Sequence, residues 1–309
     1  MNRTDGAAEK WTVLPVFQLI TALTGFIGNT FVIVAFAVNR SLWTPFNVYV
    51  INLVFANWAL TVLQFPMDVI SSLSEGKWSL GETACTYYIL AEWYLQPLIL
   101  NSHQAIAINR VWAIGFPISY RRFHSVRIAI GLCVGVWCYV LVGLAPGFLP
   151  DVLYNRVPLS ANHTSCELNW RAQFSWAVAF QTIFLIWPQI FMVLAFGVIF
   201  VRQRMRQQSR AAWRSNEVRP SRVEEQQNGR QRNSESNRGS ASKEQQGNIL
   251  LLLLTISITI CWSPNNIYFT GQYIWDYDSP DLFVVSFDLL FSCFITEEDA
   301  TIKTGRSTT

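Results

Sequence analysis

Long apolar stretches alternate with short polar ones along most of the chain, at about 11–38, 46–70, 82–114, 126–148, 174–201, 248–273 and 281–295. An α-helix rises about 1.5 Å per residue and the hydrocarbon core of a bilayer is roughly 30 Å thick, so about 20 residues are needed to cross it. The first six stretches are long enough, and the seventh is short. The pattern predicts an all-α membrane protein, a seven-transmembrane helix bundle.

Composition agrees with a membrane protein and indicates where the membrane domain begins and ends. Hydrophobic residues make up 51% of the sequence and charged residues only 14%, crowded into a few segments, which is not the surface of a soluble protein. Residues 1–10 are a polar N-terminus without the features of a signal peptide, 11–295 form the membrane domain, and 296–309 are a short polar tail. Residues 202–246 have almost no aliphatic side chains, so we expect a long, disordered loop whose first residues continue the fifth helix.

The basic residues predict the orientation in the membrane. Arg40, Arg121, Arg122, Arg127 and the arginines within 202–238 all fall on one side of the predicted spans. Lys and Arg are concentrated in cytoplasmic loops, so the N-terminus is expected outside a multi-pass plasma-membrane protein. The net charge of +3 is explained by these loops, and nucleic-acid binding is not expected. The lipid bilayer is the expected environment of the chain.

Two cysteines and two glycosylation sequons lie on the predicted outer side of the membrane. Cys85 and Cys166 lie at the predicted outer face, where the compartment is oxidising, and we expect a disulfide between them. The other four cysteines lie within apolar stretches and are interpreted as core thiols. Asn2 and Asn162 each begin an Asn-x-Thr sequon on the outer side, which predicts glycosylation there.

A series of single residues falls in successive spans at a characteristic spacing. Together they resemble a rhodopsin-like G-protein-coupled receptor over residues 25–295, nearest in motifs to the amine and muscarinic receptors. The matching positions are Gly28-Asn29, Asn52-Leu53, Ala56-Asn57, Pro66, Trp78, Gly81, Cys85, Asn109-Arg110-Val111, Pro117, Tyr120-Arg121, Trp137, Pro188 and Cys261-Trp262-Ser263-Pro264.

The resemblance assigns the coupling residues. In this family the arginine of Asn109-Arg110-Val111 is restrained at rest and released toward the G protein on activation, and Arg110 is the residue expected to transduce the signal. Asn109 replaces the usual aspartate, which weakens that restraint and predicts raised basal activity. Pro264 removes a backbone hydrogen bond and kinks its helix, so that the cytoplasmic end can swing. Asn57 and Ile99 replace residues that bind sodium in the family, so no sodium site is expected.

Glu92 is the principal candidate for ligand binding. It lies two helical turns, about 10 Å, from Cys85. An acid in hydrocarbon costs about 2.5–3.5 kcal/mol on insertion scales, so Glu92 should face a polar cavity or a partner. Amine receptors carry the aspartate that pairs with the ligand's ammonium group at this position. The alternative, a carboxylate at the outer interface that is solvated or paired with a lysine or arginine, is equally compatible with the sequence.

The family's geometry suggests further pocket residues, with aromatic faces able to hold an ammonium group by cation–π attraction. Asn266 matches the asparagine of muscarinic receptors, whereas Asn265 replaces a tyrosine, and the fifth span lacks the serines that bind catechols. The expected ligand-binding residues besides Glu92 are Trp93, Gln96, Gln181, Phe184, Trp262, Asn265 and Asn266.

The sequence therefore predicts a G-protein-coupled receptor that binds a small extracellular amine and activates a heterotrimeric G protein. A neuropeptide-type receptor remains the alternative, because Asp276, Asp278 and Asp281 could attract a basic peptide. A third possibility is a non-signalling heptahelical protein. The acids at 297–299 cannot continue a lipid-facing helix, so the seventh helix is expected to be truncated or aberrant after Ile295.

Other classes of protein find no support in the sequence. The three histidines, His103, His124 and His163, are scattered over different depths and loops, so neither an enzyme nor a metal site is expected, and no cofactor is predicted. No internal repeat relates two halves of the chain, which disfavours many transporter folds.

Overall fold

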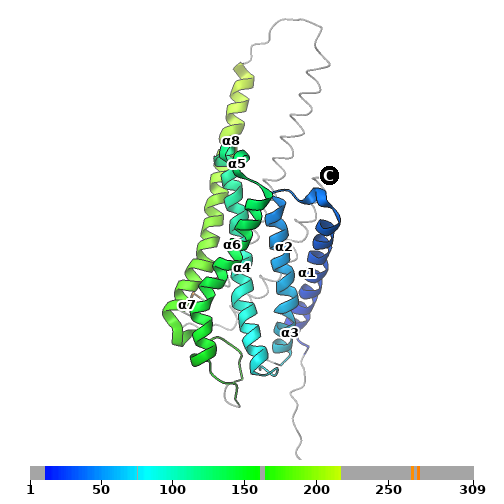
Figure 1. Cartoon of the computed structure of the whole chain (residues 1–309), viewed down its shortest axis with the longest axis vertical. Helices are drawn as coiled ribbons and strands as arrows, with labels where there is room; N and C mark the ends of the chain where they lie inside the picture. Colours follow the sequence, from blue (N-terminus) through cyan, green and yellow to red (C-terminus); the bar gives the residue numbers. More distant parts are fainter. Residues whose placement is uncertain (1–10, 75, 161–163, 217–265, 268–269, 272–309) are drawn as a thin grey trace, which may run out of the picture.

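The computed structural model describes residues 11–74, 76–160, 164–216, 266–267 and 270–271. All regular elements within these ranges are helices, and the long ones lie side by side along the longest axis of the molecule (Figure 1). The longer elements are α1 (Val13–Val38), α2 (Asn47–Leu63), α3 (Phe65–Leu73), α4 (Glu82–Gly115), α5 (Pro117–Phe123), α6 (Val126–Pro150), α7 (Phe174–Phe180) and α8 (Trp187–Asn216). The short ones are η1 (Arg40–Leu42), η2 (Asp151–Asn155), η3 (Trp170–Gln173) and η4 (Gln181–Ile186).

Four helical segments in the described part of the chain are long and apolar enough to cross a membrane: Val13–Val38, Asn47–Leu73, Val126–Asn155 and Trp170–Arg202. They match four of the stretches expected from the sequence. The stretches expected at 248–273 and 281–295 lie almost wholly outside the described residues, as does the expected end of the seventh helix after Ile295.

The remaining predicted span, α4, is longer but more polar, with 34 residues. It packs against α2, α6 and α8, so neighbouring helices surround it where lipid would surround an outer helix. Asn101, Ser102 and Asn109 are all buried on it. A central helix can carry such groups because neighbouring helices offer hydrogen-bond partners, as they do to Asn101 and Ser102.

The second span is not one continuous helix, although the apolar stretch at 46–70 predicts a single one. The structure ends α2 at Leu63 and starts α3 at Phe65, with Gln64 between them. Pro66 has no backbone N–H to donate to the preceding turn, which explains the break. The helical segment then continues to Leu73, three residues beyond the expected end.

The fifth span changes pitch inside the bundle. The α-helical α7 is followed by the π-helical turn η4 and then by α8, which continues to Asn216 and projects beyond its neighbours in Figure 1. The side-chain amide of Asn101 on α4 donates a hydrogen bond of 2.9 Å to the carbonyl of Phe184 within this turn. Residues 202–216 of the predicted disordered loop are therefore helical, and its remainder lies outside the described residues.

Two glycines on α6 allow the fifth span to approach closely. A Cβ built on Gly143 would lie 2.1 Å from the ring of Phe184, and one on Gly147 would lie 2.2 Å from the ring of Trp176. The indole N–H of Trp176 also donates to the carbonyl of Gly143 at 3.0 Å. Residues this small permit the aromatic rings to pack directly against the α6 backbone.

Asn52 joins three helices in the interior. Its amide nitrogen donates to Ser102 of α4 at 3.0 Å, and its carbonyl oxygen accepts from the indole of Trp137 on α6 at 2.8 Å. Both halves of the side-chain amide are therefore used. The matched polar positions of the second and fourth spans thus fix α2, α4 and α6 relative to one another.

Candidate functional site

A disulfide fixes the first end of α4. Cys85, on the first turn of α4, is bonded to Cys166, as expected from the sequence. Trp78 ties the same loop down a second time, because its backbone N–H donates to the carbonyl of Thr164 at 2.7 Å. The segment around residues 164–169 is thereby held over this end of the helices.

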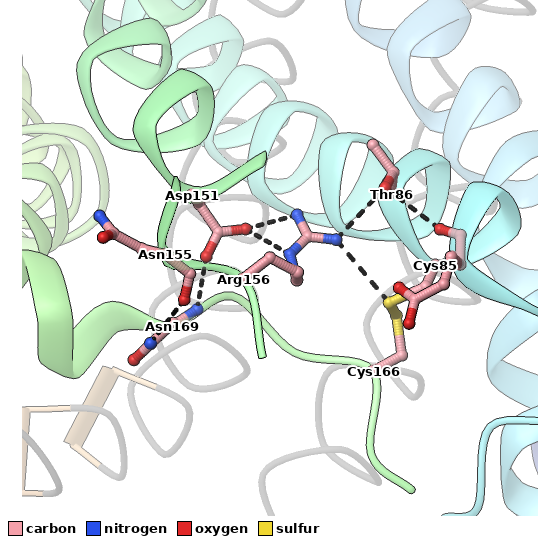
Figure 2. A network of polar contacts seen from close by, with 8 residues as sticks. Cys85, Thr86, Asp151, Asn155, Arg156, Cys166 and Asn169 are labelled. Carbon is pink, nitrogen blue, oxygen red and sulfur yellow. Dashed lines mark hydrogen bonds and ion pairs between the residues drawn. A yellow bond between two sulfur atoms is a disulfide. The ribbon is translucent and has the colours of Figure 1, made fainter. Parts of the chain in front are cut away.

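An ion pair fixes the two ends of the loop that carries Cys166 (Figure 2). The guanidinium of Arg156 is paired with the carboxylate of Asp151, and it also donates to the hydroxyl of Thr86 on α4 at 3.3 Å. Asp151 accepts a further hydrogen bond of 2.9 Å from the backbone N–H of Asn169, whose side chain donates to the carbonyl of Asn155. Both ends of the loop, at Arg156 and at Asn169, therefore contact the carboxylate of Asp151.

Glu92 lies beneath this loop and near two other acids. The carboxylates of Asp68 on α3 and Glu167 next to Cys166 are close enough to interact with it electrostatically. The phenol of Tyr88, one turn before Glu92 on α4, donates to Asp68 at 2.7 Å. Within the described residues Glu92 has no ion-pair partner, so the paired alternative left open by the sequence is not seen there.

Trp93 points into a different neighbourhood from Glu92, because consecutive residues on an α-helix are about 100° apart. Its ring centroid is 5.6 Å from that of Trp176 and 5.8 Å from that of Phe180. Phe180 in turn stacks on Phe184 at 4.7 Å. Trp93 and Phe184, both expected in the pocket, thus belong to an aromatic cluster between α4, α6 and the fifth span.

Gln181 and Asn266 meet in an amide network. The side chain of Gln181 donates to the carbonyl oxygen of Asn266 at 3.2 Å, and the amide of Asn266 donates to Gln189 at 2.7 Å. All three side chains are buried. The network uses both ends of the Asn266 amide to connect its segment to the fifth span, while Gln96 lies half-buried one turn beyond Glu92 on α4.

The other end of α4 carries the expected coupling residues. The guanidinium of Arg110 lies over the ring of Phe46, 3.6 Å from its centroid. Asn109 is buried beside the hydroxyl of Tyr120 on α5, and burial raises the pKa of Tyr120 while Asn109 and Arg110 oppose that shift. Val111 follows Arg110 and packs against the main core.

His124 joins the same end of the bundle to α5. Its ring stacks on Tyr120 at a centroid distance of 4.2 Å, lies parallel to Tyr49 of α2 at 6.1 Å, and meets the edge of Trp112 at 5.9 Å. Burial in this aromatic cluster lowers the pKa of His124. The sequence alone predicts no role for His124, which is one of three histidines scattered along the chain.

Trp262, Pro264 and Asn265, together with the sequon residues Asn2 and Asn162, lie outside the described residues. Sequence reasoning missed Asp68, although it is an acid within an apolar stretch and the insertion-cost argument used for Glu92 applies to it equally.

The helix bundle and the disulfide between Cys85 and Cys166 agree with the protein family that matches this sequence. The model of the 7 transmembrane receptor (rhodopsin family) matches residues 28–296. The chain belongs to the rhodopsin family of seven-transmembrane receptors, and it is therefore a multi-pass plasma-membrane protein of a signalling family.

Individual relatives share about a quarter to a third of their residues with this chain over the matched regions. The chain is 30% identical to the tyramine receptor Ser-2 of Caenorhabditis elegans over 190 residues, which are 62% of this chain and 40% of that protein. It is 32% identical to melanopsin of Mus musculus over 196 residues, 62% of this chain and 37% of that protein. It is 24% identical to 5-hydroxytryptamine receptor 1B of Cavia porcellus over 204 residues, 65% of this chain and 51% of that protein. The chain spans between about a third and a half of the length of these relatives.

Proposed function

We propose that this chain is a receptor for a small cationic amine that arrives from the extracellular side and signals through a heterotrimeric G protein. The single observation that carries the proposal is Glu92, a half-buried carboxylate inside the bundle that has no ion-pair partner among the described residues. A charge in that position is costly unless something pairs with it. A protonated amine supplies the missing positive charge.

The surroundings of Glu92 favour an organic cation. Tyr88 lies one turn before Glu92 on α4, so an aromatic side chain lies on the same side of the helix as the carboxylate. Aromatic faces attract cations in the same places where carboxylates do. Two relatives are named as receptors for tyramine and for 5-hydroxytryptamine, which is consistent with an amine ligand.

Orientation and coupling complete the proposal. The N-terminus and the disulfide of Cys85 lie on the extracellular side, and Arg110 lies on the cytoplasmic side, where basic residues gather. In this arrangement a ligand at Glu92 biases the helix bundle toward a state that releases Arg110 from Phe46 for the G protein.

Substitution of Glu92 by glutamine tests this function, because it removes the charge and keeps the size and shape of the side chain. Cells expressing the wild type and Glu92→Gln at equal surface levels are exposed to a panel of monoamines, and second messengers are recorded. We expect the amine response of the variant to fall at least tenfold, since a hydrogen bond to a charged group contributes about 1.5–3 kcal/mol.

The matched control is Glu82→Gln, because Glu82 is an exposed carboxylate at the start of the same helix and bonds the backbone N–H of Leu159. It should leave the amine response unchanged. An amine response that is equal in the wild type and Glu92→Gln contradicts the proposal. A response to basic peptides that survives in Glu92→Gln would favour the peptide alternative, and no second-messenger change with any ligand would favour a non-signalling protein.

A further inference from the structure

A second carboxylate, Asp68, lies in the same neighbourhood as Glu92 but on another helix. Asp68 is only 3% exposed, and its Oδ1 accepts the hydrogen bond from Tyr88. Its Oδ2 is buried and has no hydrogen-bond partner. A buried acceptor without a donor is rare in folded proteins, because its desolvation is not compensated.

Gln64 provides an independent observation of the same kind. It lies one turn before Asp68 on the same side of the second span, is 1% exposed, and its side chain is near the Asp68 carboxylate. The carbonyl oxygen Oε1 of Gln64 is buried and also lacks a donor. Two unused acceptors on one face of the second span therefore lie next to a group that interacts electrostatically with Glu92. The site around Asp68 and Gln64 therefore has more hydrogen-bond acceptors than donors.

Protein cations in the described part of the chain do not supply the missing donors. Arg156 is paired with Asp151, and Arg110 lies over Phe46 at the far end of α4. Lys77 and Arg171 are exposed, and Arg171 lies over the ring of Trp170. Asp68 and Glu92 repel each other when both are charged, and the low dielectric of a buried site strengthens that repulsion. A bound ligand that places a positive charge near each carboxylate would remove the repulsion between Asp68 and Glu92.

The described residues around Asp68 and Glu92 disfavour a metal ion as the missing positive charge. Within the described ranges no three acidic, histidine or cysteine side chains converge closely enough to hold a metal. Tyr88, which bonds Asp68, is a full helical turn from Glu92, a rise of about 6 Å. Two carboxylates that come from different helices and interact with each other match two ammonium groups on one flexible molecule.

We propose that the site takes a ligand with two cationic groups, a diamine, of which one ammonium pairs with Glu92 and the other with Asp68 and Gln64. This proposal rests on the proposed function, because it assigns Glu92 the same role. It adds that Asp68 decides the preference for a diamine over a monoamine of equal length.

A pair of alkylamines of equal chain length tests the proposal without any variant. The purified full chain in lipid nanodiscs is titrated with cadaverine, which has an ammonium group at each end, and with pentylamine, which has one. Ligands that bind the folded state raise the melting temperature according to concentration and affinity, so apparent Kd values follow. We expect cadaverine to bind roughly tenfold or more tightly than pentylamine, because it makes one additional charged contact.

Variants assign the additional contact to Asp68. Asp68→Asn should reduce cadaverine binding to the level of pentylamine and leave pentylamine binding unchanged. Asp68→Glu, which keeps the charge, should retain a preference for cadaverine and serves if the asparagine variant does not fold. Glu82→Gln, at the exposed start of α4, should behave as the wild type.

Two outcomes would overturn the proposal. Equal binding of cadaverine and pentylamine to the wild type, with both lost in Glu92→Gln, would remove the diamine and leave the amine receptor standing. A preference for cadaverine that persists undiminished in Asp68→Asn would mean that another group receives the second ammonium. The amine function itself is judged separately, by the signalling of Glu92→Gln.

Discussion

Asp151 and Arg156 form an ion pair that is almost completely withdrawn from solvent, with side-chain exposures of 0% and 11%. The pair connects the end of α6 to the loop that carries Cys166, because Asp151 also accepts from Asn169. A buried charge that loses its partner is strongly destabilising. The pair should therefore contribute more to the stability of this loop than an exposed ion pair would.

Replacing Asp151 by alanine should lower the free energy of unfolding by roughly 3–5 kcal/mol, because Arg156 is left buried without a counter-charge. Surface expression should fall with it, and thermal melting of the purified chain in nanodiscs measures the loss. The double variant Asp151→Leu, Arg156→Met should recover most of the loss. If it is less stable than Asp151→Ala, the penalty does not arise from the unpaired arginine.

Gly147→Ala should destabilise the packing between α6 and α7. The added Cβ would lie 2.2 Å from the ring of Trp176, and such overpacking costs about 1–3 kcal/mol. Gly135→Ala is the matched control, because a Cβ there meets nothing within 4 Å on the same helix. Alanine also favours helix over glycine, so the control should be neutral or slightly stabilising. Equal melting temperatures for the two variants would contradict the close contact.

The stability of the chain should decrease as the pH falls below about 6.5, the ordinary pKa of histidine. Burial lowers the pKa of His124, so the unfolded chain binds a proton more readily than the folded one in this range. The contribution of neutral His124 is fully present above pH 6.5 and is lost as the pH falls through the folded pKa. His124→Phe, which keeps a ring between Tyr49 and Tyr120, should reduce this pH dependence in melting experiments between about pH 5 and 7.5. An identical pH profile in the variant would exclude His124 as its source.

Asn109→Asp should reduce ligand-free signalling. A carboxylate next to Arg110 restrains the guanidinium more strongly than the neutral amide, because charged hydrogen bonds are roughly twice as strong as neutral ones. A several-fold reduction of basal second-messenger levels is expected at equal surface expression, corresponding to about 1 kcal/mol. Asn109→Ala provides the comparison, since it offers Arg110 no restraint and should not reduce the basal signal. Unchanged signalling in Asn109→Asp would show that the asparagine does not set the basal level.

The positions of helices and the family could be predicted because both depend on local patterns. Apolar runs long enough to cross a bilayer predicted the five spans that the structure describes, and single residues such as Trp137 and Pro188 carried the resemblance. Local rules also explain the errors. The apolar pattern of the second span continues through Pro66, so it does not predict the break at Gln64 that the missing backbone N–H of Pro66 causes.

The candidate site was predicted less completely. Glu92, Trp93, Gln181 and Phe184 were expected to share one pocket because they lie near one another in the family's geometry. Trp93 and Phe184 belong to the aromatic cluster against α6, while Glu92 interacts electrostatically with Asp68. That all four line one ligand pocket stays a prediction. One step along an α-helix turns a side chain by about 100°, so adjacency in sequence does not place two residues at one site.

The sequence by itself determined that this protein crosses a membrane, which cysteines pair, and which receptor family it belongs to, because hydrophobicity, compartment and motif spacing are properties of the chain. Only the tertiary structure decided what each polar side chain faces. Three examples each join separate elements. They are the hydrogen bond of Tyr88 to Asp68, the contacts of Asp151 with Arg156 and Asn169, and the aromatic cluster around His124. Such contacts depend on how the helices are rotated and packed, which no local pattern specifies.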